Sequence, residues 1–231
     1  MHDKYNEITH LHLLRHGECQ GGAIFRGSSN VELSAKGFAQ MQASCDYAAQ
    51  TLNHHWDVII SSPLARCRYF AEHFSKNNNI ELDIDERIRE MSFGDWDGKL
   101  VETVWRDYEA VMTRWSADPA SITPPNGEPM SDVARRLLEA YRDITQRYRG
   151  KKILLIMHGG VIRVLLTQLL NMPLTFANRF EVPYANLTAL NLYHGHAVTE
   201  LTPDSARSEA TNSISPSIDK LKLVSHNMVP L

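Results

Sequence analysis

The chain has 231 residues, of which 43% are hydrophobic and 22% are charged, a composition that is ordinary for a globular protein. Its formal net charge of -3 provides no basic field for nucleic acid, and no run of about 20 apolar residues could cross a membrane. The N-terminus, MHDKYNEITH, lacks the basic start and apolar run of a signal peptide, so we expect a cytoplasmic protein without nucleic-acid or membrane partners.

Predicted strands and helices alternate along the chain. Apolar runs with the length of buried strands lie at residues 8–14, 57–60, 80–84, 152–157 and 187–193. Apolar residues at helical spacing lie at residues 38–52, 64–74, 100–115, 133–148 and about 160–171. Ser34 can cap the first of these helices, and Ser62 with Pro63 can begin the second. The alternation predicts an α/β fold, a three-layer αβα sandwich with a mostly parallel central sheet.

The C-terminal part of the chain changes in character. A hairpin across His194-Gly195, which joins residues 187–193 to residues 197–201, ends the patterned part. Beyond it the composition shifts to Ser, Asn, Pro and Ala. The sequence therefore predicts a single domain over residues 1–201 and a polar tail over residues 202–231, in which the short segment KLKLV is available to dock.

Charged side chains stand where several predicted strands end. The first strand ends in Arg15-His16, the second leads through SSP to Arg66, and the strand KILLIM ends in His158. Glu90 lies in the irregular segment that follows the third strand. Because ligands of open α/β sheets bind outside the carboxyl ends of the strands, we expect these five side chains to converge.

A phosphate dianion is the ligand that this set of residues favours. Arg66 falls in the first turn of a helix, where the helix dipole makes an arginine mildly unfavourable unless an anion binds there. His158 directly precedes the N-terminus of a second predicted helix, where an anion would also be favoured. Taken singly, an Arg-His pair after a strand is usually a pair of solvent-exposed residues without a function, and His158 could be a hydrogen-bonded core histidine. Their coincidence at strand ends favours a functional site.

Other phosphate and metal chemistries find little support. The chain contains neither G-x-x-x-x-G-K-[ST] nor G-x-G-x-x-G, and Cys19 to Arg26 is one residue too long for the C-x5-R loop of cysteine phosphatases. Its three cysteines never form C-x-x-C, which indicates neither a disulfide framework nor a zinc site. Two histidine pairs lie away from the predicted ligand end, His10/His12 and His194/His196. We therefore expect neither a catalytic metal nor another cofactor.

Four motifs, in order, resemble those of the histidine phosphatase superfamily, whose founder is phosphoglycerate mutase. They are Arg15-His16-Gly17-Glu18, SSPLARCR with Arg66, RIREMSFGDWDG with Glu90, and MHGGVIR with His158. The resemblance covers residues 8–201 and implies the fold of that superfamily. Within it, LLRHGE followed by two glycines and F-R-G, SSPL-x-RCR-x-FAE and F-G-x-W-x-G are most similar to α-ribazole phosphatase of cobalamin biosynthesis.

The resemblance implies a metal-independent phosphomonoesterase that works through a phosphohistidine. His16 would be the nucleophile, and Glu90 would protonate the leaving alcohol and then activate water. Arg15, Arg66 and His158 would hold the phosphoryl oxygens. The partner would be a small phosphomonoester, with α-ribazole 5′-phosphate as the first expectation. Neither the composition nor the motifs indicate an oligomeric state.

The sequence also departs from the family's pattern. Many relatives have Thr and Asn three and six positions after the histidine, where this chain has Cys19 and Gly22. With Arg26, these two residues are candidates for the substrate pocket. The family's D-x-P-L is NVEL here, which leaves the substrate contacts of that loop open, and its P-G-G-E is PNGE. Glu18 and Glu128 are carried over only as supports of the site.

The segment between Glu90 and the PNGE motif bears on the choice between phosphatase and mutase. Mutases typically carry a longer insertion there, whereas this chain has one lid-like helix with Trp105, Tyr108 and Trp115. Phosphatase is therefore favoured over phosphoglycerate mutase. A phosphatase of another small metabolite, and a non-catalytic binding module on the same fold, are the remaining alternatives.

Overall fold

A six-stranded sheet forms the centre of the protein in a computed structural model that describes residues 5–51, 55–195 and 220–228. The strands are β1 (Tyr5–Arg15), β2 (Val58–Ser61), β3 (Glu81–Ile84), β4 (Lys152–Met157), β5 (Leu187–Gly195) and β6 (Lys220–Met228). They lie in the order β3-β2-β4-β1-β5-β6. The first four strands of this order are parallel, whereas β5 is antiparallel to both of its neighbours.

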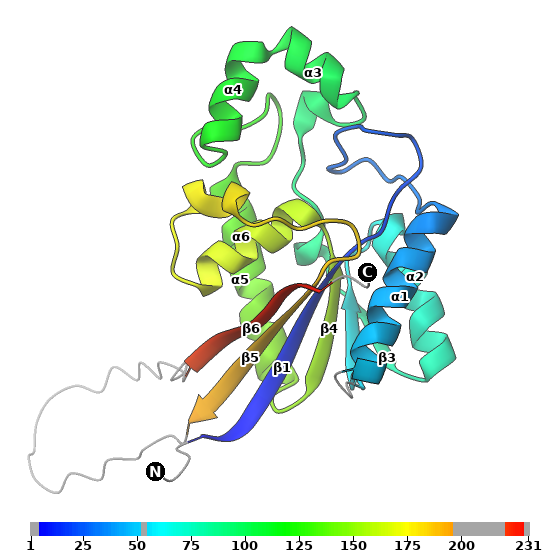
Figure 1. The fold of residues 1–231 in the computed structure, drawn as a ribbon. Coiled ribbons are helices and arrows are strands. Elements are labelled where there is room, and N and C mark those ends of the chain that lie inside the picture. Colours follow the sequence, from blue (N-terminus) through cyan, green and yellow to red (C-terminus); the bar gives the residue numbers. More distant parts are fainter. Residues whose placement is uncertain (1–4, 52–54, 196–219, 229–231) are drawn as a thin grey trace, which may run out of the picture.

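Helices cover both faces of the sheet (Figure 1). They are α1 (Ala35–Thr51) and α2 (Ala65–Asn78) on one face, and α5 (Met130–Arg147) and α6 (Gly159–Leu169) on the other. Side chains alternate along β1, so that Leu11 and Leu13 enter the core beneath α5 and α6 while Leu14 enters the core beneath α1 and α2. The predicted three-layer sandwich with a mostly parallel sheet is confirmed.

The first two helices begin differently. Ser34 caps α1 as predicted, because its Oγ accepts the N–H of Gly37 at 3.0 Å. The predicted start of the second helix at Pro63 is wrong, because α2 begins at Ala65 with Leu64 in the cap position. The Ser62 hydroxyl accepts the N–H of Leu64 at 3.3 Å and also bonds to Nε2 of His158 at 2.7 Å, while the helical hydrogen bonds begin at the oxygen of Leu64. Leu52, expected on the apolar face of α1, lies outside the described residues.

A smaller lobe stands above the carboxyl edge of the sheet and contains α3 (Val101–Asp107) and α4 (Glu109–Ala117) (Figure 1). The sequence predicted one helix here, and that prediction is wrong. The chain breaks at Tyr108, whose φ of -128° and ψ of 33° are not helical. The break allows Val104 of α3 and Met112 of α4 to pack in one cluster with the fully buried Trp96.

Three short 3-10 helices complete the described elements, η1 (Glu86–Ile88), η2 (Gly94–Trp96) and η3 (Leu174–Arg179). The strand β6 contains the KLKLV segment of the predicted tail and pairs with β5 from Leu187↔Met228 to Tyr193↔Lys220. Residues 197–201, the second half of the predicted hairpin, lie outside the described residues. Among the helices that the structure describes, none is long and apolar enough to cross a bilayer.

Candidate active site

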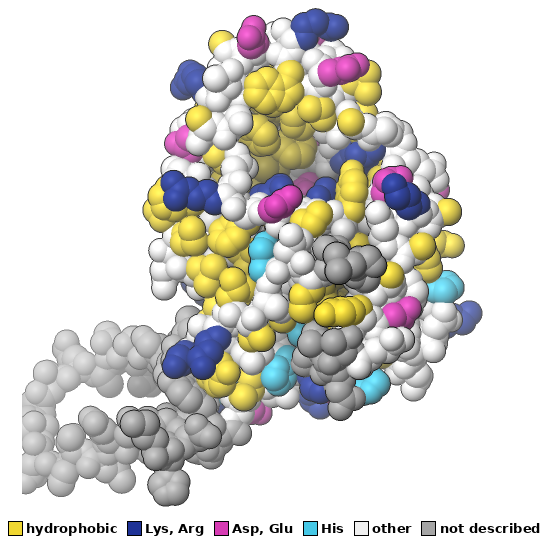
Figure 2. Space-filling model, in the orientation of Figure 1, with side chains coloured by type: hydrophobic (Ala, Val, Ile, Leu, Met, Phe, Trp, Pro, Cys, Tyr) yellow, Lys and Arg dark blue, Asp and Glu magenta, His cyan; other side chains and the backbone are white. Residues whose placement is uncertain are grey.

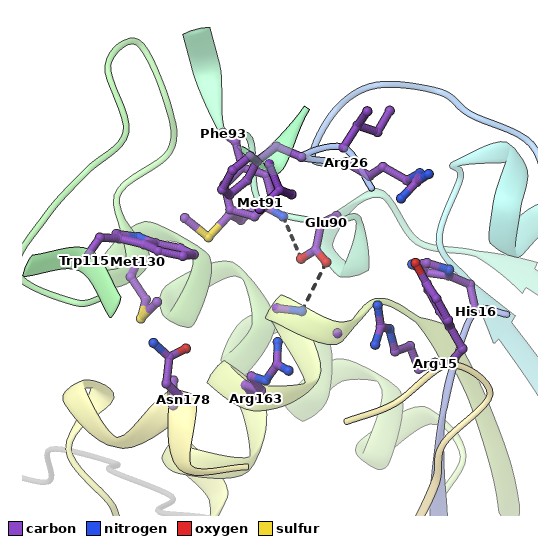
Figure 3. A pocket seen from close by; sticks show the side chains of 17 residues that line it. Arg15, His16, Arg26, Glu90, Met91, Phe93, Trp115, Met130, Arg163 and Asn178 are labelled. Atoms are coloured by element: carbon purple, nitrogen blue, oxygen red, sulfur yellow. Dashed lines mark hydrogen bonds between the residues drawn. The ribbon is translucent and has the colours of Figure 1, made fainter. Parts of the chain in front are cut away.

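A cavity of about 320 Å³ opens between the lobe of α3 and α4 and the carboxyl ends of β1 and β4. Figure 2 shows it as a hollow with hydrophobic side chains on its upper wall and charged side chains at its base. Arg15, His16, Arg26 and Glu90, which the sequence singled out, line the cavity (Figure 3). The volume falls within the range of small-molecule sites.

His16 stands directly after the last residue of β1. Its backbone N–H donates to the oxygen of Met157 in β4 at 3.0 Å, which extends the strand pairing into the site. Its Nδ1 lies 2.8 Å from the backbone oxygen of Gly17. A carbonyl oxygen can only accept, so Nδ1 carries the proton and Nε2 keeps a lone pair.

The surroundings of His16 favour the neutral imidazole. The side chain is buried, with 4% of its surface exposed. This burial, and then the positive charges of Arg15 and Arg66, lower the pKa of His16 well below its usual range. At neutral pH the lone pair on Nε2 is therefore available for reaction.

Arg15 is held between the backbone and a tyrosine that the sequence analysis missed. Its Nη1 donates to the oxygen of Val182 at 2.5 Å, and its Cζ lies 4.3 Å from the centroid of the Tyr184 ring. The same ring lies 5.8 Å from that of His16. Tyr184 thus positions both members of the Arg15-His16 pair, although the EVPYAN segment that contains it carried no motif.

Glu90 projects over the N-terminus of α6. Its carboxylate accepts the backbone N–H of Met91, Gly160 and Val161, each at 3.1 Å. Two of these donors belong to the first turn of α6, where the helix dipole favours a negative charge. The hydrogen bonds hold the carboxylate at the edge of the cavity that also contains His16.

The two glycines after His158 each make room for one functional side chain. A Cβ on Gly159 would lie 3.0 Å from Nε of Arg15, and a Cβ on Gly160 would lie 2.7 Å from Oε1 of Glu90. The HGG sequence is therefore a packing requirement of the site, because a larger residue would displace either the arginine or the carboxylate.

Arg66 and His158 lie behind the cavity and are fully buried. Arg66 donates from Nε to Nδ1 of His158 at 3.1 Å, so His158 carries its proton on Nε2, which donates to Oγ of Ser62 at 2.7 Å. Burial, followed by the charge of Arg66, lowers the pKa of His158 well below its usual range. The rings of His16 and His158 lie 5.3 Å apart.

The guanidinium of Arg66 also organises the loop before the second helix. It donates to the backbone oxygens of residues 26, 27 and 29 at 2.8 to 3.1 Å. The expected partner of this early-helix arginine was an anion. In the structure, three backbone oxygens and Nδ1 of His158 accept hydrogen bonds from four of its five N–H groups. One N–H of Nη1 has no partner among the described residues.

Two of the three pocket candidates do not line the cavity. Cys19 is buried behind His16, with its Sγ 3.5 Å from Nδ1 of His16, and burial raises the pKa of its thiol. Gly22 lies in a turn with a φ of 71°. Arg26 does line the cavity and donates to the backbone oxygens of Gln20 and Gly22. Gly22 contributes its backbone oxygen as an acceptor for Arg26 and does not line the cavity itself.

The two glutamates expected to support the site differ in position. Glu18 forms an exposed ion pair with Lys36 at 2.8 Å, which ties the loop to α1. Glu128 forms a two-fold interaction with Arg136, at 2.7 and 2.9 Å, and their side chains are only 16% and 11% exposed. Arg136 also donates to the backbone oxygen of Arg89 at 2.9 Å. Glu128 thereby braces the segment that carries Glu90.

The structure also brings forward two cavity residues outside the predicted set, Arg163 and Asn178. Arg163 is the last letter of MHGGVIR, and its spacing of five after His158 would have placed it one turn along α6. Within the described ranges, no group of three or more His, Cys, Asp or Glu side chains is placed to hold a metal ion.

The family is decided by comparison with known proteins. A model of the histidine phosphatase superfamily (branch 1) matches residues 11–205. The chain belongs to this superfamily. It is accordingly a phosphatase, a hydrolase whose substrate is a small phosphorylated molecule.

Relatives within the histidine phosphatases carry different names. The chain is 28% identical over 187 residues to phosphoserine phosphatase 1 of Hydrogenobacter thermophilus, and this alignment covers 80% of this chain and 87% of that protein. It is 26% identical over 201 residues to adenosylcobalamin/alpha-ribazole phosphatase of Salmonella typhimurium, which covers 83% and 94%. The solved structure of a mycobacterial glucosyl-3-phosphoglycerate phosphatase has a TM-score of 0.71 at 27% identity and covers 81% and 92%.

Proposed function

We propose that this histidine phosphatase hydrolyses a phosphomonoester through a phosphohistidine on Nε2 of His16, without a metal ion. The tautomer of His16 carries the proposal. Because Nδ1–H is donated to Gly17, the lone pair is on Nε2 of a neutral ring that lines the cavity. A neutral imidazole with a free Nε2 is the form that can attack phosphorus.

In the first step, Nε2 of His16 attacks phosphorus and the bond between phosphorus and the alcohol oxygen breaks. Glu90 gives its proton to that departing oxygen, so the alcohol leaves in its neutral form. In the second step, a water molecule attacks the phosphohistidine while Glu90 takes one of its protons. Phosphate is released, and His16 and protonated Glu90 are restored.

In this proposal, arginine side chains neutralise the charge of the phosphoryl oxygens, which a metal ion does in other phosphatases. Arg15 lines the cavity beside His16, and Arg66 lies behind with one N–H uncommitted. We assign both to the phosphoryl oxygens, where charge accumulates in the transition state. His158 joins them if its Nε2–H exchanges the Ser62 hydroxyl for a phosphoryl oxygen. Turnover should then be insensitive to EDTA, and loss of activity that one divalent ion restores would contradict the proposal.

The alcohol half of the substrate has two candidates. α-Ribazole 5′-phosphate, favoured by the sequence, is supported by the aromatic wall that Phe25, Phe93 and Trp115 give the cavity, which suits a flat ring. A phosphorylated hydroxy acid such as phosphoserine is favoured by Arg163, a cation in the alcohol half of the same cavity. The relatives' names include both kinds of substrate. A role in cobalamin biosynthesis follows only if α-ribazole 5′-phosphate is the substrate. The proposed cytoplasmic location is tested by cell fractionation.

The test of the catalytic proposal is to trap the intermediate. Wild type is mixed with p-nitrophenyl phosphate, quenched in alkali, digested and searched for a base-stable phosphate adduct on the peptide that contains His16. His16→Ala should lose the adduct and the turnover, while His73→Ala, which changes an exposed histidine of α2, should keep both. A His16→Ala variant with a sizeable fraction of wild-type kcat would overturn the proposal.

A further inference from the structure

Arg163 is a cation in the cavity with donors to spare. Its Nε donates to the backbone oxygen of Phe180 at 2.9 Å, which fixes the direction of the side chain. Its two terminal amino groups make no hydrogen bond to any residue that the structure describes. Figure 3 places Arg163 beside Asn178 at the base of the cavity, below Glu90.

The charges around the cavity exceed what one phosphate needs. Arg15, Arg26 and Arg163 line it with a single carboxylate, that of Glu90, and Arg66 adds a further positive charge from behind. The sum is three positive charges when Glu90 is ionised and four when it carries the proton that it gives to the alcohol. A phosphate dianion balances two of them, so at least one cation is left for another anionic group.

Position shows which arginine is left. Arg15 adjoins the nucleophile His16, and Nη2 of Arg26 is tied to the backbone of its own turn, although Nε of each of these two arginines is buried without a partner within the described ranges. Arg163 comes from α6, and burial lowers the pKa of its guanidinium while Glu90 and Glu181 act in the opposite sense. A half-buried guanidinium without a paired anion is unfavourable, and its two amino groups match the two oxygens of a carboxylate.

We infer that Arg163 binds a carboxylate on the alcohol half of the substrate, which makes the substrate a phosphorylated hydroxy acid or hydroxy amino acid. The inference rests on the proposed function, because it takes the phosphoryl site at His16 as given. Asn178 fits the same substrate class. Its Nδ2 donates to the backbone oxygen of Ser116 at 3.2 Å, so Oδ1 is presented as an acceptor for an ammonium or hydroxyl group.

A matched pair of substrates tests the inference directly. O-Phosphoserine and O-phosphoethanolamine share the phosphate ester and the amine and differ by the carboxylate alone. Wild type should hydrolyse phosphoserine with a kcat/KM that is about 10- to 100-fold higher, the factor that hydrogen bonds to a charged group supply. This comparison needs no variant, so it holds even if a substituted protein folds poorly.

Variants then assign the preference to Arg163. Arg163→Met should reduce the ratio of the two kcat/KM values to within about threefold of one, and Arg163→Lys should restore part of it. Arg179→Met is the control, because Arg179 is an exposed arginine of η3 that stacks on Phe176 and does not line the cavity. It should leave the wild-type ratio unchanged.

The outcomes separate this inference from the proposed function. If wild type forms the His16 adduct but hydrolyses both substrates equally, the inference is overturned and the catalytic proposal stands. An equal loss for both substrates in Arg163→Met overturns it too, as does a higher kcat/KM for α-ribazole 5′-phosphate, which has no carboxylate, than for phosphoserine. If no substrate yields a phosphohistidine, the proposed function fails and the inference fails with it.

Discussion

His16 donates its Nδ1–H to the backbone oxygen of Gly17 at 2.8 Å, so a single local hydrogen bond decides which nitrogen can react. Gly17 is required for this geometry, because a Cβ there would overlap the backbone of Gly37 in α1. The nucleophile's tautomer is thus tied to the packing of the first helix against the first strand end.

The pH dependence of the reaction should reflect this environment. Burial, Arg15 and Arg66 lower the pKa of His16, so the ring stays neutral and reactive at pH values below the ordinary histidine pKa of about 6.5. With p-nitrophenyl phosphate, whose leaving group needs little help from Glu90, we expect kcat/KM, corrected for ionisation of the substrate, to stay level as the pH falls from 8 through about 6.5. Stopped-flow rates of phosphohistidine formation between pH 4 and pH 8 check this. An acid limb that is centred at or above the ordinary value would contradict the assignment.

The role of Glu90 should depend on the leaving group. An alkoxide needs a proton to depart, whereas p-nitrophenolate leaves largely unaided, so Glu90→Gln should slow an alkyl phosphate by roughly 10²- to 10⁴-fold and p-nitrophenyl phosphate much less in the phosphorylation step. Arg15→Met should slow both substrates alike, because it holds oxygens that they share. A quenched-flow burst with each substrate measures the step. Equal losses in Glu90→Gln would remove Glu90 from the acid's role.

Gly160 should behave as part of the same acid. A Cβ at this position would lie 2.7 Å from Oε1 of Glu90, so Gly160→Ala should displace the carboxylate and slow alkyl phosphates about 10-fold or more, with a smaller effect on p-nitrophenyl phosphate. Gly98→Ala is the control, since its φ of 78° strains an added side chain whose Cβ would contact only Oγ of Ser29, which does not line the cavity. It should lower the thermal midpoint without changing the ratio of the two rates. A ratio left at the wild-type value in Gly160→Ala would show that the carboxylate tolerates the methyl group.

Arg136 should stabilise the segment that carries Glu90. Arg136→Met removes the interaction with Glu128 and the donors to the backbone oxygens of residues 87 and 89, so we expect a loss of about 2 kcal/mol or more in unfolding free energy. Arg135→Met is the matched control. The side chain of Arg135 is 68% exposed in its pair with Asp132, and its loss should cost less than about 1 kcal/mol. Urea unfolding of the two variants measures the difference, and equal losses would argue against the bracing role of Arg136.

Chemically distinctive residues at strand ends made much of the site predictable. The apolar run before Arg15-His16 and the run before His158 have the length and composition of buried strands, and parallel strands bring their carboxyl ends to one edge. Glu90 was reached through its motif. Arg163 lies within the sequence MHGGVIR, but its role could not be predicted from it, because that role depends on the absence of a hydrogen-bond partner for its terminal amino groups among the described residues.

Both errors in helix boundaries lie where long-range contacts are made. Ser62 and Pro63 have the residue types of a helix start, and the Ser62 hydroxyl, which accepts the N–H of Leu64, also bonds to His158, a residue 96 positions away. No glycine or proline marks the break at Tyr108, whose ring packs against that of Trp96 at 6.0 Å between ring centroids. Local propensity is a weak preference that such long-range contacts override.

The sequence by itself determined the order of strands and helices and the chemical groups at the strand ends, because periodicity and residue type are properties of short segments. Only the tertiary structure decided which donors are committed. In it, Arg66 donates to backbone oxygens and Cys19 lies behind His16. The terminal amino groups of Arg163 remain in the cavity without a partner in the part of the chain that the structure describes. Hydrogen-bond partners far apart in sequence are chosen by how the layers pack, since a buried donor must take the acceptor that packing places within reach.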